Sequence, residues 1–122
     1  MPAIHAASVS TKNGRVATLR EFRENGDEYN YSFEDGIIRE AVYNPFKGDV
    51  AIHLEYTREK RKNNECVLEV RVVDMTKRNP VHKETAYLEF DEDYEAFNRH
   101  LKSTFETIVE AHLTLLAKKE DT

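Results

Sequence analysis

Residues 91–119 read DEDYEAFNRHLKSTFETIVEAHLTLLAKK, and this stretch carries the strongest periodic pattern in the chain. Apolar or aromatic residues return every seven positions, at Tyr94, Leu101, Ile108 and Leu115. This spacing places them on one side of an α-helix. Acidic residues crowd the beginning of the stretch and lysines its end, which suits the helix dipole. The pattern therefore predicts one long helix over residues 91–119, with Asp91 as its N-cap.

The predicted helix changes character along its length. Its first half is amphipathic, whereas its second half is apolar on more sides. A helix of this length extends about 40 Å, but a strand of seven or eight residues extends only about 25 Å. We therefore expect the sheet to leave the apolar half uncovered and a second copy of the chain to cover it, most simply in a homodimer. The expected oligomer contacts are Leu101, Phe105, Ile108, Val109, His112, Leu113, Leu115 and Leu116. A helix that ends sooner, or that packs on the N-terminal segment, is the alternative.

Short alternating segments before the helix predict strands. Asn25-Gly26 and Asp35-Gly36 are dipeptides typical of tight hairpin turns, because both positions tolerate positive φ. Side chains alternate cleanly between apolar and polar in residues 28–34 and 50–57. The six expected strands cover residues 15–23, 28–34, 37–43, 50–57, 66–75 and 84–90.

The expected fold is α+β: an antiparallel six-stranded meander sheet with one long C-terminal helix packed on one face. We expect residues 1–13 to form a partly ordered arm and residues 14–122 a single domain, with strands in 15–90 and the helix in 91–119. The expected contacts of the sheet with the helix are Ile52, Leu54, Leu68, Val70, Leu88 and Phe90.

Composition limits the class of protein. The chain has 122 residues, of which 34% are charged and 39% apolar, as in one globular domain. A single cysteine, Cys66, precludes an intrachain disulfide and favours a reducing compartment. No secretory signal or membrane span is recognisable, so we expect a cytoplasmic protein. The net charge of −5 arises from the acidic excess of residues 89–122.

No motif in the sequence indicates catalysis. The five histidines show no HExxH or paired spacing, and there is no CxxC, so we expect no metal site and no cofactor. The sequence also lacks GxSxG, GxGxxG and the phosphate-binding GxxxxGK[ST] motif. The acidic residues around Asp91 are better explained by helix capping than by a cation site. We therefore expect a non-enzymatic protein.

Binding of single-stranded nucleic acid has more support. If the helix covers one face of the sheet, the other displays His53, Arg71 and Tyr87. Two loops add basic residues: Arg58, Lys60, Arg61 and Lys62, and then Lys77, Arg78 and Lys83. Aromatic and basic side chains on a sheet face suit single strands, because they stack on bases and neutralise phosphates. The alternative is a solvated face, since Glu55, Glu69 and Glu89 lie on the same side and repel phosphates.

The segment AYLEFDEDYEAFNRHLKSTFETI, residues 86–108, resembles the closing strand and helix of PUR repeats, the purine-rich-element-binding modules. The plan of strands and helix is also similar to that of the Whirly family. Both families bind single-stranded DNA or RNA on a curved sheet and dimerise through their helices. The resemblance implies the same function here. Two alternatives remain open: a protein-interaction or inhibitor module, and an oligomer that sequesters a small nucleotide-like ligand.

Overall fold

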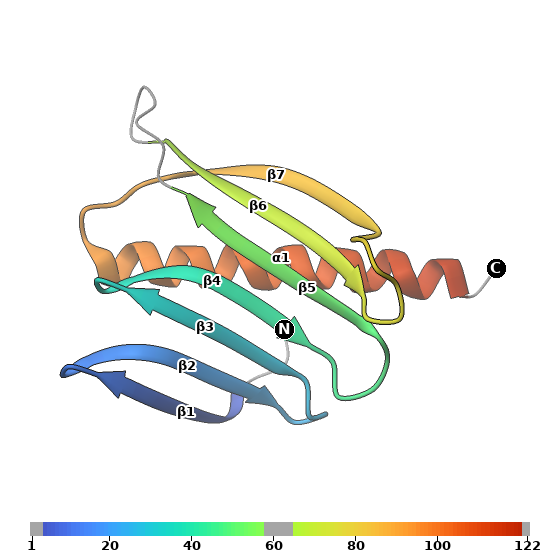
Figure 1. Ribbon diagram of the computed structural model, residues 1–122, viewed down its shortest axis with the longest axis horizontal. Coiled ribbons are helices and arrows are strands. Elements are labelled where there is room, and N and C mark those ends of the chain that lie inside the picture. The colour runs from blue at the N-terminus through green and yellow to red at the C-terminus, as the bar shows by residue number, and fades with distance from the viewer. Residues whose placement is uncertain (1–3, 58–64, 121–122) are drawn as a thin grey trace.

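The computed structural model describes residues 4–57 and 65–120, which form seven strands and one helix (Figure 1). The strands are β1 (Ile4–Lys12), β2 (Arg15–Arg23), β3 (Glu28–Glu34), β4 (Ile37–Asn44), β5 (Val50–Thr57), β6 (Glu65–Asp74) and β7 (His82–Glu89). The helix is α1 (Tyr94–Glu120). Each strand pairs antiparallel with the next, in the order β1 to β7. The predicted α+β class, the antiparallel meander and the long C-terminal helix are confirmed.

The prediction of six strands is wrong, because residues 4–12, expected as a partly ordered arm, form β1 at the edge of the sheet. β1 pairs with β2 from Ile4–Arg23 to Lys12–Arg15. All nine residues of β1 are exposed, so no apolar alternation marks the strand. The turn between β1 and β2 is nevertheless recognisable in the sequence, because Asn13-Gly14 is the same hairpin dipeptide as Asn25-Gly26. Asn13 and Gly14 both have positive φ, 55° and 76°.

The helix begins at Tyr94 rather than at residue 91, because Asp93 is its N-cap. The backbone N–H groups of Glu95 and Ala96 donate to Asp93 Oδ1 over 3.1 and 3.3 Å. Asp91, the predicted cap, holds the preceding turn instead by accepting the Asp93 N–H over 2.9 Å. The carboxylates of Asp91 and Asp93 therefore accept the backbone N–H groups of the turn between β7 and α1 and of the first turn of the helix.

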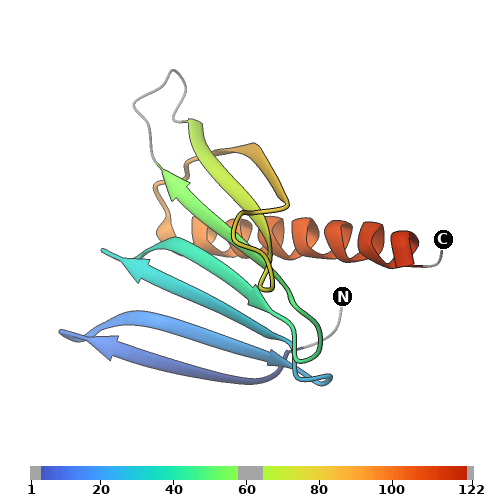
Figure 2. The ribbon, with the colours of Figure 1, turned by 45° about the vertical axis from the view of Figure 1, so that its right-hand side comes forward.

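The core lies between α1 and one face of the twisted sheet (Figure 2). Four residues spaced four apart on α1, here called the core stripe, are at most 1% exposed: Phe97, Leu101, Phe105 and Val109. The six predicted sheet residues, Ile52, Leu54, Leu68, Val70, Leu88 and Phe90, all belong to the same buried cluster. Phe105 contacts the rings of Tyr29 and Tyr31 edge-on, with centroids 6.0 and 6.3 Å apart.

The core stripe corrects part of the predicted oligomer interface. Leu101, Phe105 and Val109 are core residues of their own chain, so they are not contacts to a second copy. The prediction compared the helix with the length of a strand, but α1 crosses the strands obliquely (Figure 1). The sheet therefore covers the helix as far as Val109, and only the C-terminal end of α1 runs beyond the sheet. Of the remaining five, Ile108 and Leu113 pack against the core, His112 and Leu116 are half-buried, and Leu115 is exposed.

Replacing the central aromatic residue tests the helix–sheet packing. Phe105→Ala should lower the free energy of unfolding by about 3–5 kcal/mol, because it leaves a cavity under α1. Ser103→Ala, which changes an exposed position on the same helix, should stay within about 0.5 kcal/mol of the parent protein. Urea unfolding followed by circular dichroism measures both values. Similar stabilities for the two variants would contradict the packing described here.

Candidate functional site

The face of the sheet opposite α1, here called the open face, carries a line of basic side chains. The strand registers join Arg20 to Asn30, Asn30 to Val42, Val42 to His53, His53 to Arg71 and Arg71 to Lys83. We call Arg20, His53, Arg71 and Lys83 the basic row. Directly opposed residues share a face, and strands lie about 4.8 Å apart, so the row crosses about 24 Å of the sheet.

A parallel line of carboxylates lies beside the basic row. Glu40, Glu55 and Glu69 are joined by register in the same way and form the acidic row. The two rows contact one another: His53 Nε2 lies 3.5 Å from Glu40 Oε1, and Arg71 Nη2 forms an ion pair with Glu69 Oε2 at 3.5 Å. Exposed pairs of this kind contribute little stability, so their cations remain available to another anion.

The structure brings together only some of the predicted binding residues. His53 and Arg71 face one another, and Lys83, expected in a loop, stands beside Arg71 on β7. Tyr87 lies on the same face, four residues further along β7, and is 53% exposed. Lys77 and Arg78 are exposed in the connection between β6 and β7.

The remaining predicted contacts, Arg58, Lys60, Arg61 and Lys62, lie outside the described residues. Arg20 was missed by the sequence analysis, because only the pairing register shows that β2 continues the row started by His53. Alternation within residues 15–23 was too irregular to assign its side chains to faces.

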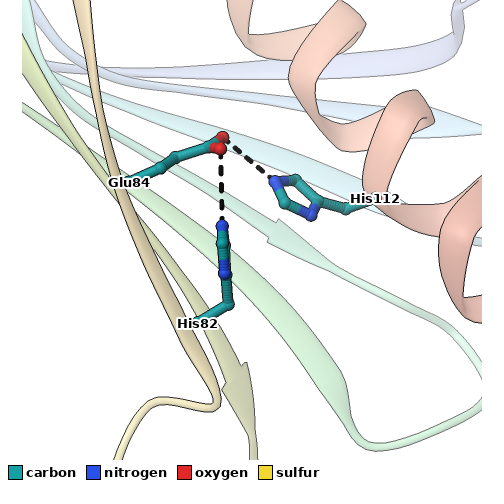
Figure 3. A group of neighbouring side chains, drawn as sticks. All are labelled: His82, Glu84 and His112. Carbon is teal, nitrogen blue, oxygen red and sulfur yellow. Dashed lines mark hydrogen bonds and ion pairs between the residues drawn. The ribbon is translucent and has the colours of Figure 1, made fainter.

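A second group of polar side chains lies between the edge strand and the helix. His82 and Glu84 of β7 and His112 of α1 point toward one another (Figure 3). His112 Nε2 lies 3.0 Å from Glu84 Oε1, and His82 Nε2 lies 3.4 Å from Glu84 Oε2. The hydrogen bond from His112 lowers the pKa of Glu84; partial burial opposes this shift and His82 adds to it. We call these three residues the His–Glu–His cluster.

The sequence analysis missed the His–Glu–His cluster because His112 is far in sequence from His82 and Glu84. His82 and His112 are separated by the strand β7, the turn at Asp91 and half of the helix. Local spacing rules look for ligands within a few residues of one another, as in HExxH. Only the docking of α1 against β7 brings these side chains together.

A buried network of charges joins β2 to α1. Arg23 and Glu21 are each only 4% exposed. The Arg23 guanidinium donates to Glu106 Oε1 over 2.8 Å, and Lys102 Nζ donates to Glu21 Oε2 over 2.6 Å. Because removal of one partner leaves an uncompensated buried charge, these ion pairs fix the position of β2 on the helix. They hold the start of the basic row in place.

Three buried tyrosines next to this network remain neutral. Burial raises the pKa of Tyr29 to about 12, with a smaller increase from Glu106 and an opposing effect from Arg23, whose guanidinium lies 4.3 Å from the ring centroid. Burial also raises the pKa of Tyr31. For Tyr43, burial and the hydrogen bond that its hydroxyl donates to Asp27 over 2.7 Å both raise the pKa.

The raised pKa of Tyr29 predicts alkaline destabilisation. The unfolded chain releases the phenol proton near pH 10, whereas the folded chain keeps it to about pH 12, so stability falls as the pH rises through this window. Tyr29→Phe lacks this proton and should lose about 1 kcal/mol less stability than the parent protein between pH 8 and pH 11. Urea midpoints at both pH values measure the difference, and the pH 8 values control for packing. Equal losses in the two proteins would contradict a buried, neutral Tyr29.

Comparisons with known proteins give no functional guide. No known protein family, curated protein or solved structure matches this chain. Within the described part of the chain, no helix is both long enough and apolar enough to span a membrane. The open face and the His–Glu–His cluster are therefore the features that bear on function.

Proposed function

We propose that the protein is a non-enzymatic binding module that takes single-stranded DNA or RNA on the open face of its sheet. The observation that carries the proposal is the basic row, in which basic side chains from β2, β5, β6 and β7 stand in one register. A flexible single strand lying across the sheet passes each of these side chains in turn. Phosphate neutralisation along such a line supplies affinity that does not depend on sequence.

Stacking surfaces lie at the β7 end of the open face. The Tyr87 ring is 53% exposed, and it stands about 13 Å along the strand from Lys83. A depression of about 330 Å³ beside the basic row is lined by residues 69–71 of β6 and 83–85 of β7. A base stacked on Tyr87, with a phosphate further along the same strand between Arg71 and Lys83, uses both features.

The acidic row sets the strength of this binding. Three members of the basic row already have carboxylate partners: Arg20 pairs with Glu28, His53 with Glu40 and Arg71 with Glu69. A phosphate must displace these carboxylates, so part of the electrostatic gain is offset. We therefore expect moderate affinity and strong salt dependence, because three or four phosphates are neutralised.

A labelled oligothymidine titrated by fluorescence anisotropy tests the proposal. The affinity should fall with a log–log salt slope of about −2 to −3, since each neutralised phosphate on a single strand contributes about −0.7. Arg71→Ala combined with Lys83→Ala should make the slope shallower by about 1.4. These two cations lie on neighbouring strands of the open face.

Arg99→Ala is the matched control, because Arg99 is an exposed cation on the helix, away from the open face. It should leave both the affinity and the salt slope unchanged. Absence of binding at 50 mM salt would overturn the proposal. So would an equal loss of affinity in Arg99→Ala and in the open-face variant.

We propose further that two copies of the chain pair through the side of the molecule that carries α1. The C-terminal end of α1 runs beyond the sheet (Figure 1), and Leu115 there is 56% exposed. On the same side of the sheet, β1 places Val9 opposite Leu19, and Val9 is 56% exposed. A second copy that covers these apolar side chains leaves both open faces accessible.

Sedimentation equilibrium at tens of micromolar tests the pairing. The parent protein should have twice the 14.2 kDa mass of one chain. Leu115→Glu places a charge in the proposed contact and should give the mass of a single chain. Tyr87→Glu changes an exposed residue on the open face, on the other side of the sheet from α1, and should remain paired. A single-chain mass for the parent protein would overturn the pairing.

A further inference from the structure

The His–Glu–His cluster has the ligand types of a transition-metal site. Each of His82, Glu84 and His112 offers one ligand atom, and the three atoms lie within 4.8 Å of one another. Two imidazoles and a carboxylate are a ligand set that Zn²⁺ uses when a fourth position is left for water. We propose that this cluster binds Zn²⁺ or a similar late first-row divalent ion.

The spacing of the cluster is close to that of a bound ion. Ligand atoms about 2.0–2.1 Å from a tetrahedral Zn²⁺ lie about 3.3 Å from one another. His112 Nε2 lies 3.0 Å from Glu84 Oε1 and His82 Nε2 lies 3.4 Å from Glu84 Oε2, so each imidazole is near this separation from one oxygen of the carboxylate. The separation between the two histidines closes by a rotation of His82, whose side chain is 50% exposed. The hydrogen bonds to Glu84 are then replaced by bonds to the ion.

The helix α1 holds His112 more rigidly than the edge strand β7 holds His82. The His112 side chain is only 14% exposed, and its helix is anchored by the core stripe. His82 and Glu84 alternate with Lys83 on β7, so both point toward α1 while Lys83 points to the open face. Exposure of His82 gives an ion and its water access to the site.

Binding at this position has a structural consequence. Among the described strands, β7 lies at the edge of the sheet and pairs with β6 alone. An ion held by β7 and α1 together ties this edge to the helix. Because an ion that binds the folded chain alone stabilises it by mass action, the melting temperature should rise with ion concentration. A concentration one hundred times the Kd should raise it by about 10 °C.

Cobalt and zinc titrations of the 122-residue chain test the site. Co²⁺ added to the parent protein should give the intense visible absorption of a tetrahedral site at one equivalent, and Zn²⁺ should remove it by displacement. His112→Ala and His82→Ala should each weaken Co²⁺ binding by at least about tenfold. His82→Ala changes a half-exposed residue at the edge of the sheet, so it is expected to fold even if His112→Ala does not.

His100→Ala is the matched control, because His100 is an exposed histidine on the same helix. It should leave the cobalt spectrum and the Zn²⁺-dependent melting shift unchanged. Absence of a tetrahedral cobalt spectrum at millimolar Co²⁺ would overturn the proposal. A spectrum that persists in His82→Ala and in Glu84→Gln would do so as well.

The metal site and the nucleic-acid proposal can fail separately. The cobalt titration contains no oligonucleotide, and the anisotropy titration is performed with a chelator present. Lys83 lies between the two ligands of β7 but faces away from them. Lys83→Ala should therefore weaken oligonucleotide binding without changing the cobalt spectrum.

Discussion

The packing of the core stripe of α1 against one face of the sheet determines the rest of the structure. Four fully buried side chains from the helix meet the apolar residues of β3 to β7. This contact decides which face of the sheet is covered and which remains open. It also sets the rotation of the helix about its axis, and so it aims His112 at β7 and Lys102 and Glu106 at β2. The proposed sites on both faces are consequences of this one contact.

Because α1 covers one face of the sheet, the charged residues of the two faces have different surroundings. On the covered side, charges near the core are matched closely, as in the pairs of Arg23 with Glu106 and of Lys102 with Glu21. On the open face, Arg20 pairs with Glu28 at 2.7 Å, but the contacts of His53 with Glu40 and of Arg71 with Glu69 are 3.5 Å long and more exposed. Buried pairs are costly to break, whereas exposed pairs exchange easily with an external anion. The same residue types therefore stabilise the fold on one side and are available for binding on the other.

The sequence predicted the individual strands and the helix better than it predicted how they pair and pack. Asn25-Gly26 and Asp35-Gly36 marked hairpins because their backbones need positive φ, and the structure has it at Gly26, Asp35 and Gly36. The seven-residue repeat in 91–119 predicted α1, since a buried helix face requires that spacing. β1 was not predicted, because an edge strand whose residues are all exposed needs no apolar pattern. The Asn-Gly dipeptide of its turn was nevertheless present in the sequence.

The alternation of apolar and polar residues alone predicted part of the open face. His53 and Arg71 were placed on one face correctly, because neighbouring hairpin strands with clean alternation fix their side chains. Arg20 and the His–Glu–His cluster depended on register and on the docking of α1, which local sequence does not specify. The predicted interface failed at Leu101, Phe105 and Val109 for a related reason. An apolar helix residue looks the same in sequence whether its own sheet or a second chain covers it.

The most direct measurement of the helix–sheet contact is an isotope-filtered nuclear Overhauser experiment on the ring protons of Phe105. The structure places this ring edge-on to those of Tyr29 and Tyr31, with centroids 6.0 and 6.3 Å away. Strong intramolecular contacts from Phe105 to both tyrosines are expected. Contacts from Phe105 to residues of a second copy, or to Val42 on the open face, would contradict the arrangement on which both proposed sites depend.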